Sequence, residues 1–368
     1  MNVIFLGDIY LDDDYLKCEA DLLLGINNVL NEADFVVANL ESPITCSDKS
    51  ISKIGPNLKM IKLPESIIDS IDIFSLANNH IMDYSVDGLA DTINYLESKG
   101  KQYFGGGYNI SDAYSEIVLE KGGRKVALIG MAENEFSLSF GNEAGVAPVD
   151  PIYSYHYVAA VIAKYDDVIL FIHGGNEFSS LPSPRYRKLC HMYIDMGITS
   201  IVSSHTHIIG PVEEYKGKPI FYSLGNCLFN SDKAIFGWEY GIIAKLSFTD
   251  NCLQYDYVPF EQSIKHNGIR GISGIEREEF ERDFMALCNS ITNKDEYVLR
   301  WEEFVMQNSD AYLFRVTSPF TFKGAYRLFK LLGIHKIFYK GQSRLLKNNY
   351  ISCESHREVI LHSLTREN

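Results

Sequence analysis

Residues 201–207 read Ile-Val-Ser-Ser-His-Thr-His, a β-rich run that ends directly in two histidines. A short apolar run of this kind, followed at once by polar side chains, is typical of a buried strand that ends at a sheet edge. In an extended segment residues i and i+2 point to the same side, so His205 and His207 are placed to reach one common centre. The alternative is a pair of solvent-facing loop histidines.

Four other apolar runs end in polar residues of the same kinds. They are Val3–Leu6 before Asp8, Phe35–Ala38 before Glu41, Ile71–Leu76 before Asn79 and His80, and Val168–Ile172 before His173. The C-terminal ends of strands share one edge in a layered α/β sheet, and sites collect there. We therefore expect two carboxylates, an asparagine and several histidines at one edge, although a single such residue is more often a structural histidine or a turn cap.

These residue types are the ones that hold divalent transition metals. Carboxylates, imidazoles and an amide oxygen suit Mn²⁺, Fe²⁺ or Zn²⁺. Six or seven such groups exceed the needs of one four-coordinate zinc, and their number is typical of a two-metal centre. The sequence therefore predicts two metal ions at this edge.

Amphipathic stretches lie between the apolar runs and predict helices. In residues 87–99 apolar side chains recur at helical spacing and Gly100 follows as a C-cap. Strands that alternate with helices over about the first 260 residues predict an α/β layered domain. Beyond that point the composition indicates helices. The expected organisation is a domain over 1–262 and a mostly helical C-terminal extension over 263–368.

Composition and charge exclude several classes of protein. The 368 residues carry a net charge of −14, which argues against nucleic acid as a partner. No window approaches the roughly 18–20 apolar residues that span a bilayer. The first apolar run begins at residue 3 and meets Asp8, which is unlike a signal peptide. The expected location is cytoplasmic.

The segment 311–353 departs from this acidic balance. It holds eight Lys and Arg and no Asp or Glu, with aromatic residues interleaved. A basic amphipathic helix of this kind can lie on an anionic membrane surface, which would make the protein peripheral to the membrane. It can also dock on the acidic remainder of the chain, or pack its aromatics internally with its lysines in solvent.

Six motifs occur in the order in which a known family has them. They are Gly7-Asp8; Asn39-Leu40-Glu41; Ala77-Asn78-Asn79-His80 with Asp83-Tyr84; His173-Gly174-Gly175-Asn176-Glu177-Phe178; His205-Thr206-His207; and residues 215–226, Tyr-Lys-Gly-Lys-Pro-Ile-Phe-Tyr-Ser-Leu-Gly-Asn. Over roughly residues 1–260 the chain resembles the CapA family of poly-γ-glutamate capsule biosynthesis proteins, a branch of the calcineurin-like metallophosphoesterases. The resemblance implies a four-layer αββα sandwich with metals at one edge.

The resemblance also implies roles for residues. The implied ligands of two divalent metal ions (Mn, Fe or Zn) are Asp8, Glu41, Asn79, His173, His205 and His207. Glu41 is expected to bridge the two ions, with Asp8 and His207 on the first. His80 is expected to act as the general acid or to position a phosphate, held by Asp83.

Three positions depart from the family pattern. Tyr10 stands where the wider superfamily has a ligand histidine, which weakens the first metal site. Gly174 replaces a usual tryptophan. Ser204 replaces a usual glycine and is expected to shift its loop slightly, because glycine permits φ values that serine avoids.

The predicted function is a metal-dependent hydrolase of the phosphoester class, linked to capsule or poly-γ-glutamate biosynthesis. Its expected partners are a small-molecule or polymer substrate with anionic groups and the capsule synthesis machinery. The alternative is a non-catalytic accessory protein for the synthesis or export of an anionic polymer. A third interpretation is a structural relic that keeps only part of the metal site.

Overall fold

The computed structural model describes residues 1–16, 21–53, 55–230, 237–249, 252–263, 268–320, 322, 324–338, 340, 344, 347–348 and 351. By compactness the chain divides into two units, Met1–Tyr297 and Val298–Asn368. The first unit thus continues past residue 262, where the sequence predicts a domain boundary. The division into domains at residue 262 stays a prediction.

The first sheet contains the N-terminal strand at its centre. Its order is β16-β15-β14-β1-β2-β3-β4, and β13 also pairs with β1. The strands are β1 (Asn2–Tyr10), β2 (Phe35–Leu40), β3 (Ile73–Ser75), β4 (Gln102–Phe104), β13 (Asn226–Phe229), β14 (Tyr240–Phe248), β15 (Leu253–Ser263) and β16 (Gly268–Gly271). Strands β1 to β4 run parallel, so their C-terminal ends lie at one edge.

The second sheet has the order β11-β12-β10-β9-β7-β6. Its strands are β6 (Ile117–Lys121), β7 (Arg124–Ala132), β9 (Asp167–His173), β10 (Ser200–Ser204), β11 (Val212–Tyr215) and β12 (Lys218–Phe221). The inner strands β7, β9, β10 and β12 are parallel to one another. Two short strands, β5 (Gly106–Gly107) and β8 (Gly145–Val146), form a separate pair.

Helices connect the strands of the first unit. They are α1 (Asp13–Leu16), α2 (Asn27–Leu30), α3 (Glu65–Ser70), α4 (Ser85–Ser98), α5 (Ile110–Ala113), α6 (Pro151–Lys164), α7 (Pro184–Met196) and α8 (Gly274–Thr292), with a 3-10 turn η1 at Leu24–Ile26. Helices α6 and α7 each begin with proline at their first position, after a side-chain cap from Asp150 and Ser183 respectively. Both features are standard N-terminal signals.

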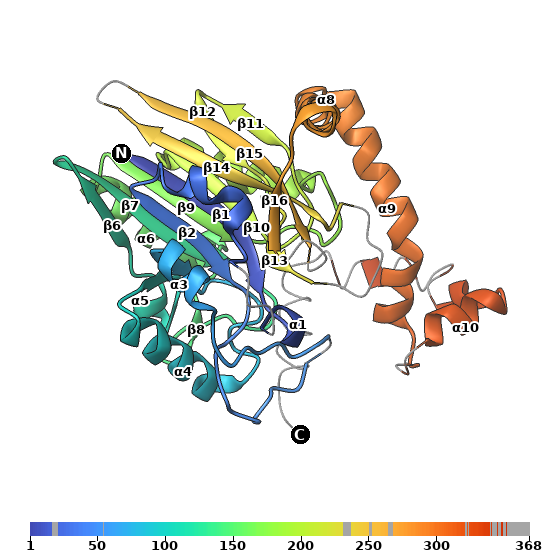
Figure 1. Cartoon of the computed structure of the whole chain (residues 1–368). Helices are drawn as coiled ribbons and strands as arrows, with labels where there is room; N and C mark the ends of the chain where they lie inside the picture. Colours follow the sequence, from blue (N-terminus) through green and yellow to red (C-terminus); the bar gives the residue numbers. More distant parts are fainter. Residues whose placement is uncertain are drawn as a thin grey trace. The chain divides into compact units, whose positions relative to one another are not determined.

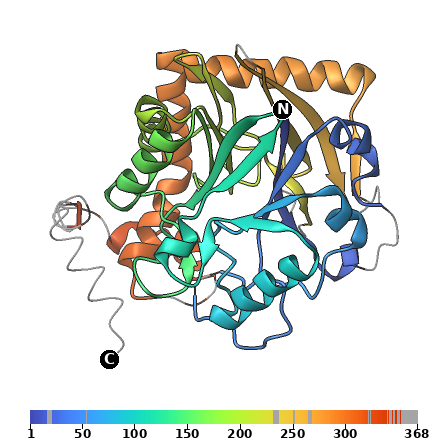
Figure 2. The same cartoon turned by 90° about the vertical axis from the view of Figure 1, so that its left-hand side faces the viewer.

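Successive side chains of β1 point to opposite faces of the first sheet, and each face packs against a different layer. Val3 and Phe5 belong to a buried cluster shared with Phe171 of β9, so one face of the first sheet packs on the second sheet. Ile4 and Leu6 belong to another cluster, which includes residues of α3 and α4. On the far face of the second sheet, residues of α6 and α7 pack on β7 and β9. The predicted αββα sandwich is therefore confirmed (Figures 1 and 2).

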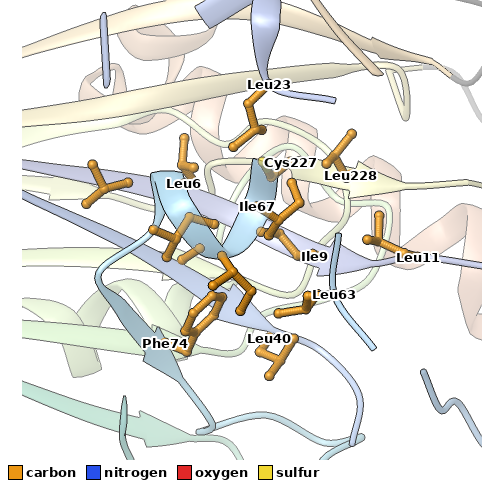
Figure 3. Close-up of a cluster of buried hydrophobic side chains, with 14 of the residues drawn as sticks. Leu6, Ile9, Leu11, Leu23, Leu40, Leu63, Ile67, Phe74, Cys227 and Leu228 are labelled. Carbon is orange, nitrogen blue, oxygen red and sulfur yellow. The ribbon is translucent and has the colours of Figure 1, made fainter. Parts of the chain in front are cut away.

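Figure 3 shows part of the cluster beneath α3. Its labelled side chains include Leu6, Ile9, Leu40, Ile67, Phe74 and Leu228. Strands far apart in the sequence meet in this cluster. The apolar runs that the sequence marks as strands of the first sheet contribute side chains to this cluster.

The second unit contains most of α9 (Lys294–Thr317), the helix α10 (Ala325–Leu331) and a 3-10 turn η3 (His335–Phe338). Phe314 and Ala325 are buried together, with Tyr326 and Phe329 packed against them. Helix α10 ends at Leu331, and Gly333 adopts a positive φ of 70° shortly after it. Among the described residues, no helix has the length and apolar character needed to cross a membrane.

Candidate metal centre

The polar residues at or near the C-terminal ends of β1, β2, β3, β9 and β10 gather in one buried place. Asp8 lies on β1, directly after Gly7, where a Cβ would fall 1.9 Å from the carbonyl oxygen of Gly225. Only glycine lets β1 and the segment entering β13 approach this closely. The strand register shifts between Leu6 and Asp8 in its pairing with β2. This irregularity turns the strand end that carries the carboxylate.

The histidines after β10 sit in an unusual backbone conformation. His205 has a φ of 104° and His207 a φ of 62°. Positive φ is uncommon for residues other than glycine, and such strain collects at functional sites. Ser204, where the family has glycine, does not have positive φ among the described residues. The backbone at position 204 therefore needs no glycine, and the expected shift of the loop stays a prediction.

A first group of potential ligands surrounds His173 at the end of β9. Its Nε2 lies 3.0 Å from Nδ1 of His205 and 3.0 Å from Oδ1 of Asn79. Oε1 of Glu41 is 3.6 Å from the same nitrogen. The Nδ1 atom of His173 is 3.1 Å from Oγ of Ser204 and 3.2 Å from Nδ2 of Asn39, so Nε2 is the ring nitrogen that faces the other candidate ligands.

A second group overlaps the first. Asp8, Glu41 and His207 each offer one ligand atom, all within 4.8 Å of one another, and Glu41, His173 and His205 do the same. Glu41 belongs to both groups. The structure thus places all six predicted ligand residues together, while their role as metal ligands stays a proposal.

Asn226 fixes the ring of His207. The Nδ2 atom of Asn226 donates to the carbonyl oxygen of His207 at 3.1 Å, so its Oδ1, at 3.0 Å, accepts from Nδ1 of the ring. In the neutral ring this leaves Nε2 unprotonated, which is the form that binds metals. Asn226 ends the motif 215–226, but its position there does not by itself indicate this role.

Aromatic rings cover the His207 side of the centre. The centroid of Trp238 is 4.7 Å from that of His207, and the centroid of Phe229 is 4.9 Å away. Tyr10, in the position of the superfamily ligand, packs its ring on Phe229 with centroids 5.0 Å apart. The second group therefore consists of Asp8, Glu41 and His207. At the position of the further superfamily ligand, Tyr10 makes an aromatic contact.

Burial dominates the electrostatics of the centre. Burial, followed by the charge of Asp8, raises the pKa of Glu41 well above its ordinary value. Burial and the neighbouring His205 lower the pKa of His173, and burial and His207 lower the pKa of His205 to about 3. The two histidines are thus neutral at neutral pH and able to bind a metal.

His80 stands next to Asn79 but turns to a different partner. Its Nδ1 lies 2.7 Å from Oδ2 of Asp83, the residue that the motif match assigns to hold it. The backbone of the turn is fixed by Asn78, whose Oδ1 accepts from the amide of His80 at 3.1 Å. Asn78 in turn donates to the carbonyl oxygen of Leu40 at 2.8 Å. The turn after β3 is thereby tied to the end of β2.

Two glutamates outside the six sequence motifs also reach the centre. Oε1 of Glu133 lies 3.4 Å from Nε2 of His205, and its Oε2 accepts from the amide of Gly175 at 3.0 Å. Burial raises the pKa of Glu133 to about 7. Oε2 of Glu135 accepts from Nδ2 of Asn79 at 2.5 Å. Glu133 follows β7, so the rule that strand ends carry the site finds it when applied to that strand as well.

Gly174 explains why Glu133 fits. A Cβ at position 174 would lie 3.2 Å from Oε2 of Glu133 and 3.4 Å from the ring of Tyr186. A large side chain at this position would therefore collide with the glutamate. The departure from the family's tryptophan makes room for a carboxylate beside the histidines.

The fold and the site together define a class. A four-layer αββα sandwich that gathers carboxylates, an asparagine and three histidines at one edge is the architecture of the metallophosphoesterase-like proteins. Within that class, the profile of the family described as "Bacterial capsule synthesis protein PGA_cap" matches residues 2–231. The chain belongs to this family.

Named relatives agree with this assignment. The PGA biosynthesis protein CapA of Bacillus subtilis (strain 168) is 30% identical over 252 residues, which are 65% of this chain and 64% of that protein. A probable polyglutamine synthesis accessory protein of Mycobacterium tuberculosis is 26% identical over 208 residues, covering 52% and 55% of the two chains. The matches thus span less than two thirds of these relatives.

Solved structures are more distant. A hypothetical protein from Thermus thermophilus is similar with a TM-score of 0.46 and 15% identity, covering 72% of this chain and 100% of that one.

Proposed function

We propose that this chain is a metal-dependent hydrolase of the phosphoester class that works in capsule or poly-γ-glutamate biosynthesis. The observation that carries the proposal is Glu41. Its side chain is buried, and neither carboxylate oxygen has a hydrogen-bond partner among the described residues. A buried carboxylate in this state is costly unless something compensates its charge. Divalent cations shared between the two groups would supply that compensation.

The donor set fits such ions. Carboxylate, imidazole and amide donors suit Mn²⁺, Fe²⁺ or Zn²⁺. The residues that would hold one ion are Asp8, Glu41 and His207, and those that would hold the other are Glu41, Asn79, His173 and His205. When bound, a pair of divalent ions supplies an activated water and stabilises charge on a tetrahedral substrate.

The chain's own residues complete the arrangement. Asp83 accepts from Nδ1 of His80. When Nε2 also carries a proton, the imidazolium can donate that proton to the leaving oxygen. Glu133 sits beside His205 with its pKa raised to about 7 by burial, so it can exchange a proton near neutral pH. The rings of Phe229 and Trp238 exclude water from the His207 side.

The proposed substrate carries anionic groups and is a small molecule or a polymer. Membership in a capsule synthesis family, and a relative named for PGA biosynthesis, support a place beside the capsule synthesis machinery. We further propose that the basic segment 311–353 makes a peripheral contact with an anionic membrane. A cytoplasmic location stays an expectation from the sequence.

A second function has its own support. Tyr10 replaces a ligand and packs on Phe229, and one relative carries the name of an accessory protein. A chain that binds metal weakly at the Asp8 group can serve polymer assembly without catalysis. This accessory role is the alternative to hydrolysis.

One experiment separates the two functions. The full chain is loaded with Mn²⁺, its metal content is measured by mass spectrometry, and turnover of 4-nitrophenyl phosphate and of bis(4-nitrophenyl) phosphate is followed. A hydrolase shows metal-dependent turnover that His205→Ala abolishes. Stoichiometric metal without turnover of either ester contradicts the hydrolase and favours the accessory role.

A further inference from the structure

Lys53 lies in the loop between β2 and α3, outside every motif of the sequence. Its side chain is only 2% exposed, and its Nζ forms an ion pair with Oδ1 of Asp83. The same nitrogen is 3.1 Å from Nδ1 of His80 and 4.9 Å from the ring centroid of Phe136. The loop between β2 and α3 thus places a buried cation beside His80, next to the candidate metal centre.

A lysine is rarely buried unless its charge is paired. Here the partner is Asp83, which is completely buried. Oδ2 of Asp83 also accepts from the amide of Leu58 at 2.7 Å and faces His80 at 2.7 Å. With Lys53 on Oδ1, both oxygens of the carboxylate are engaged, so the carboxylate is fixed against rotation.

We propose that Lys53 is a positioning residue for His80. By fixing Asp83 and closing the Nδ1 side of the imidazole, it orients the ring so that Nε2 is the nitrogen presented to substrate. The inference rests on the proposed function, because it assigns His80 to the reaction. It adds a residue that the motif match does not contain.

A purely structural ion pair is the competing explanation. Lys53 also connects the loop after β2 to the turn that follows β3, and such a link stabilises the fold whatever His80 does. The two explanations differ in one respect. A positioning residue acts through His80, so its removal has no further effect on turnover once His80 is gone.

The test is a double-mutant cycle with a matched control. Lys53→Met and His80→Ala are made singly and together. Lys59→Met is the control, because Lys59 lies on the same loop but binds Ser47 and Asp48 and lies over the ring of Tyr84. Within the described part of the chain, Lys59 forms no hydrogen bond or ion pair with Asp83 or His80. For Lys53→Met we expect kcat to fall roughly 10–100-fold, the effect of a misplaced catalytic group. KM, metal content and the Lys59→Met variant should stay within about twofold, and Lys53→Met should change nothing further in the His80→Ala background.

A Lys53→Met effect that persists in full after His80 is removed overturns the proposal. If Lys53→Met fails to fold because Asp83 is left unpaired, Lys53→Gln keeps a donor to Asp83 without the charge. The cycle is then run with Lys53→Gln, which must likewise have no further effect on turnover in the His80→Ala background.

A second readout is independent of turnover and separates failure of this proposal from failure of the proposed function. Long-range ¹H–¹⁵N spectra of the full chain report the ring nitrogens of each histidine, and the His80 signals are assigned by their loss in His80→Ala. We expect Lys53→Met to shift the His80 signals and Lys59→Met to leave them unchanged. Unshifted His80 signals in a folded Lys53→Met chain overturn the role of Lys53 even if the wild type is active. Shifted signals in a chain without turnover support the positioning of His80 while contradicting the hydrolase.

Discussion

Asn79 can present either its oxygen or its nitrogen to the centre, and Glu135 decides which. Because Oε2 of Glu135 accepts from Nδ2 of Asn79 at 2.5 Å, Oδ1 faces Nε2 of His173 at 3.0 Å. An amide nitrogen is no metal ligand, whereas the oxygen is one that Mn²⁺ accepts. The glutamate would therefore act on a bound metal through the asparagine that it holds.

Removal of Glu135 should weaken metal binding without removing a ligand. For Glu135→Ala we expect the dissociation constant of Mn²⁺ to rise by roughly 10–100-fold, as is typical when the partner of a ligand is lost. Isothermal titration of the metal-free chain measures the change. The control is Glu120→Ala on β6, where the side chain is exposed and pairs with Lys125. Equal affinity for Mn²⁺ in both variants would show that Asn79 keeps its orientation without Glu135.

His80 and His205 should fail in different ways. His80→Ala should lower turnover by roughly 10²–10⁴-fold, the typical contribution of a general acid, with its metal content unchanged. His205→Ala should lose metal, because it removes a nitrogen that lies 3.0 Å from His173 within the first group. Metal analysis and kinetics on the same samples separate the effects. Equal metal loss in both variants would contradict the role proposed for His80.

At the scale of secondary structure elements, one buried carboxylate joins α7 to β11 and β12. Glu213 of β11 accepts from Nε of Arg187 at 3.1 Å and from the hydroxyl of Tyr222 at 2.7 Å, and lies 3.0 Å from Nε2 of His191. Burial acts to raise the pKa of Glu213, but the hydrogen bonds from Arg187, Tyr222 and His191 outweigh it and lower the pKa below 4.5.

This network should make stability depend on pH. Because the pKa of Glu213 is lower in the folded chain than the ordinary 4.5, its contribution is present above that pH and is lost as the pH falls through and below it. At pH 7 we expect Glu213→Gln to lower the free energy of unfolding by about 2 kcal/mol, less than for a fully buried pair because Arg187 is partly exposed. Urea unfolding at pH 7 and pH 4 measures this. The difference between wild type and variant should shrink at pH 4, and a constant difference would contradict the assignment.

At the scale of the whole molecule, the second unit carries apolar side chains in solvent beside basic ones. Leu331 is 85% exposed and Ile337 is 70% exposed, and Arg327 and Lys330 are exposed on α10. Exposed apolar side chains flanked by cations, with no acid between residues 311 and 353, match an anionic lipid surface.

We expect the full chain to sediment with vesicles of phosphatidylglycerol and phosphatidylcholine at low salt, and not with phosphatidylcholine alone. Binding should fall steeply with salt, because the screening length shortens from about 10 Å at 0.1 M to about 3 Å at 1 M. Leu331→Asp should reduce binding, whereas Ile152→Asp on α6, a side chain that is 83% exposed in the first unit, should not. No sedimentation at low salt would leave these residues a packing or protein-binding role.

The sequence by itself determines which polar residue follows each apolar run. Asp8, Glu41, Asn79, His173 and His205 can therefore be located without coordinates, and all five are buried in the structure. The parallel direction of the strands then places their ends at one edge. Local patterns therefore predict a layered α/β domain and the convergence of the candidate ligands, whereas the four-layer αββα arrangement is what the resemblance to the family implies.

Only the tertiary structure decides which side chains hold those residues in place. Lys53 reaches Asp83, and Glu135 reaches Asn79, from loops 30 and 56 residues away in the sequence. No periodicity marks either residue, because their loops follow no regular pattern and charged loop residues are ordinarily solvated. Their contacts exist because the order of strands in the two sheets brings separate loops over one edge. A strand pattern fixes where each element ends, whereas the contacts between loops depend on how all of the elements pack.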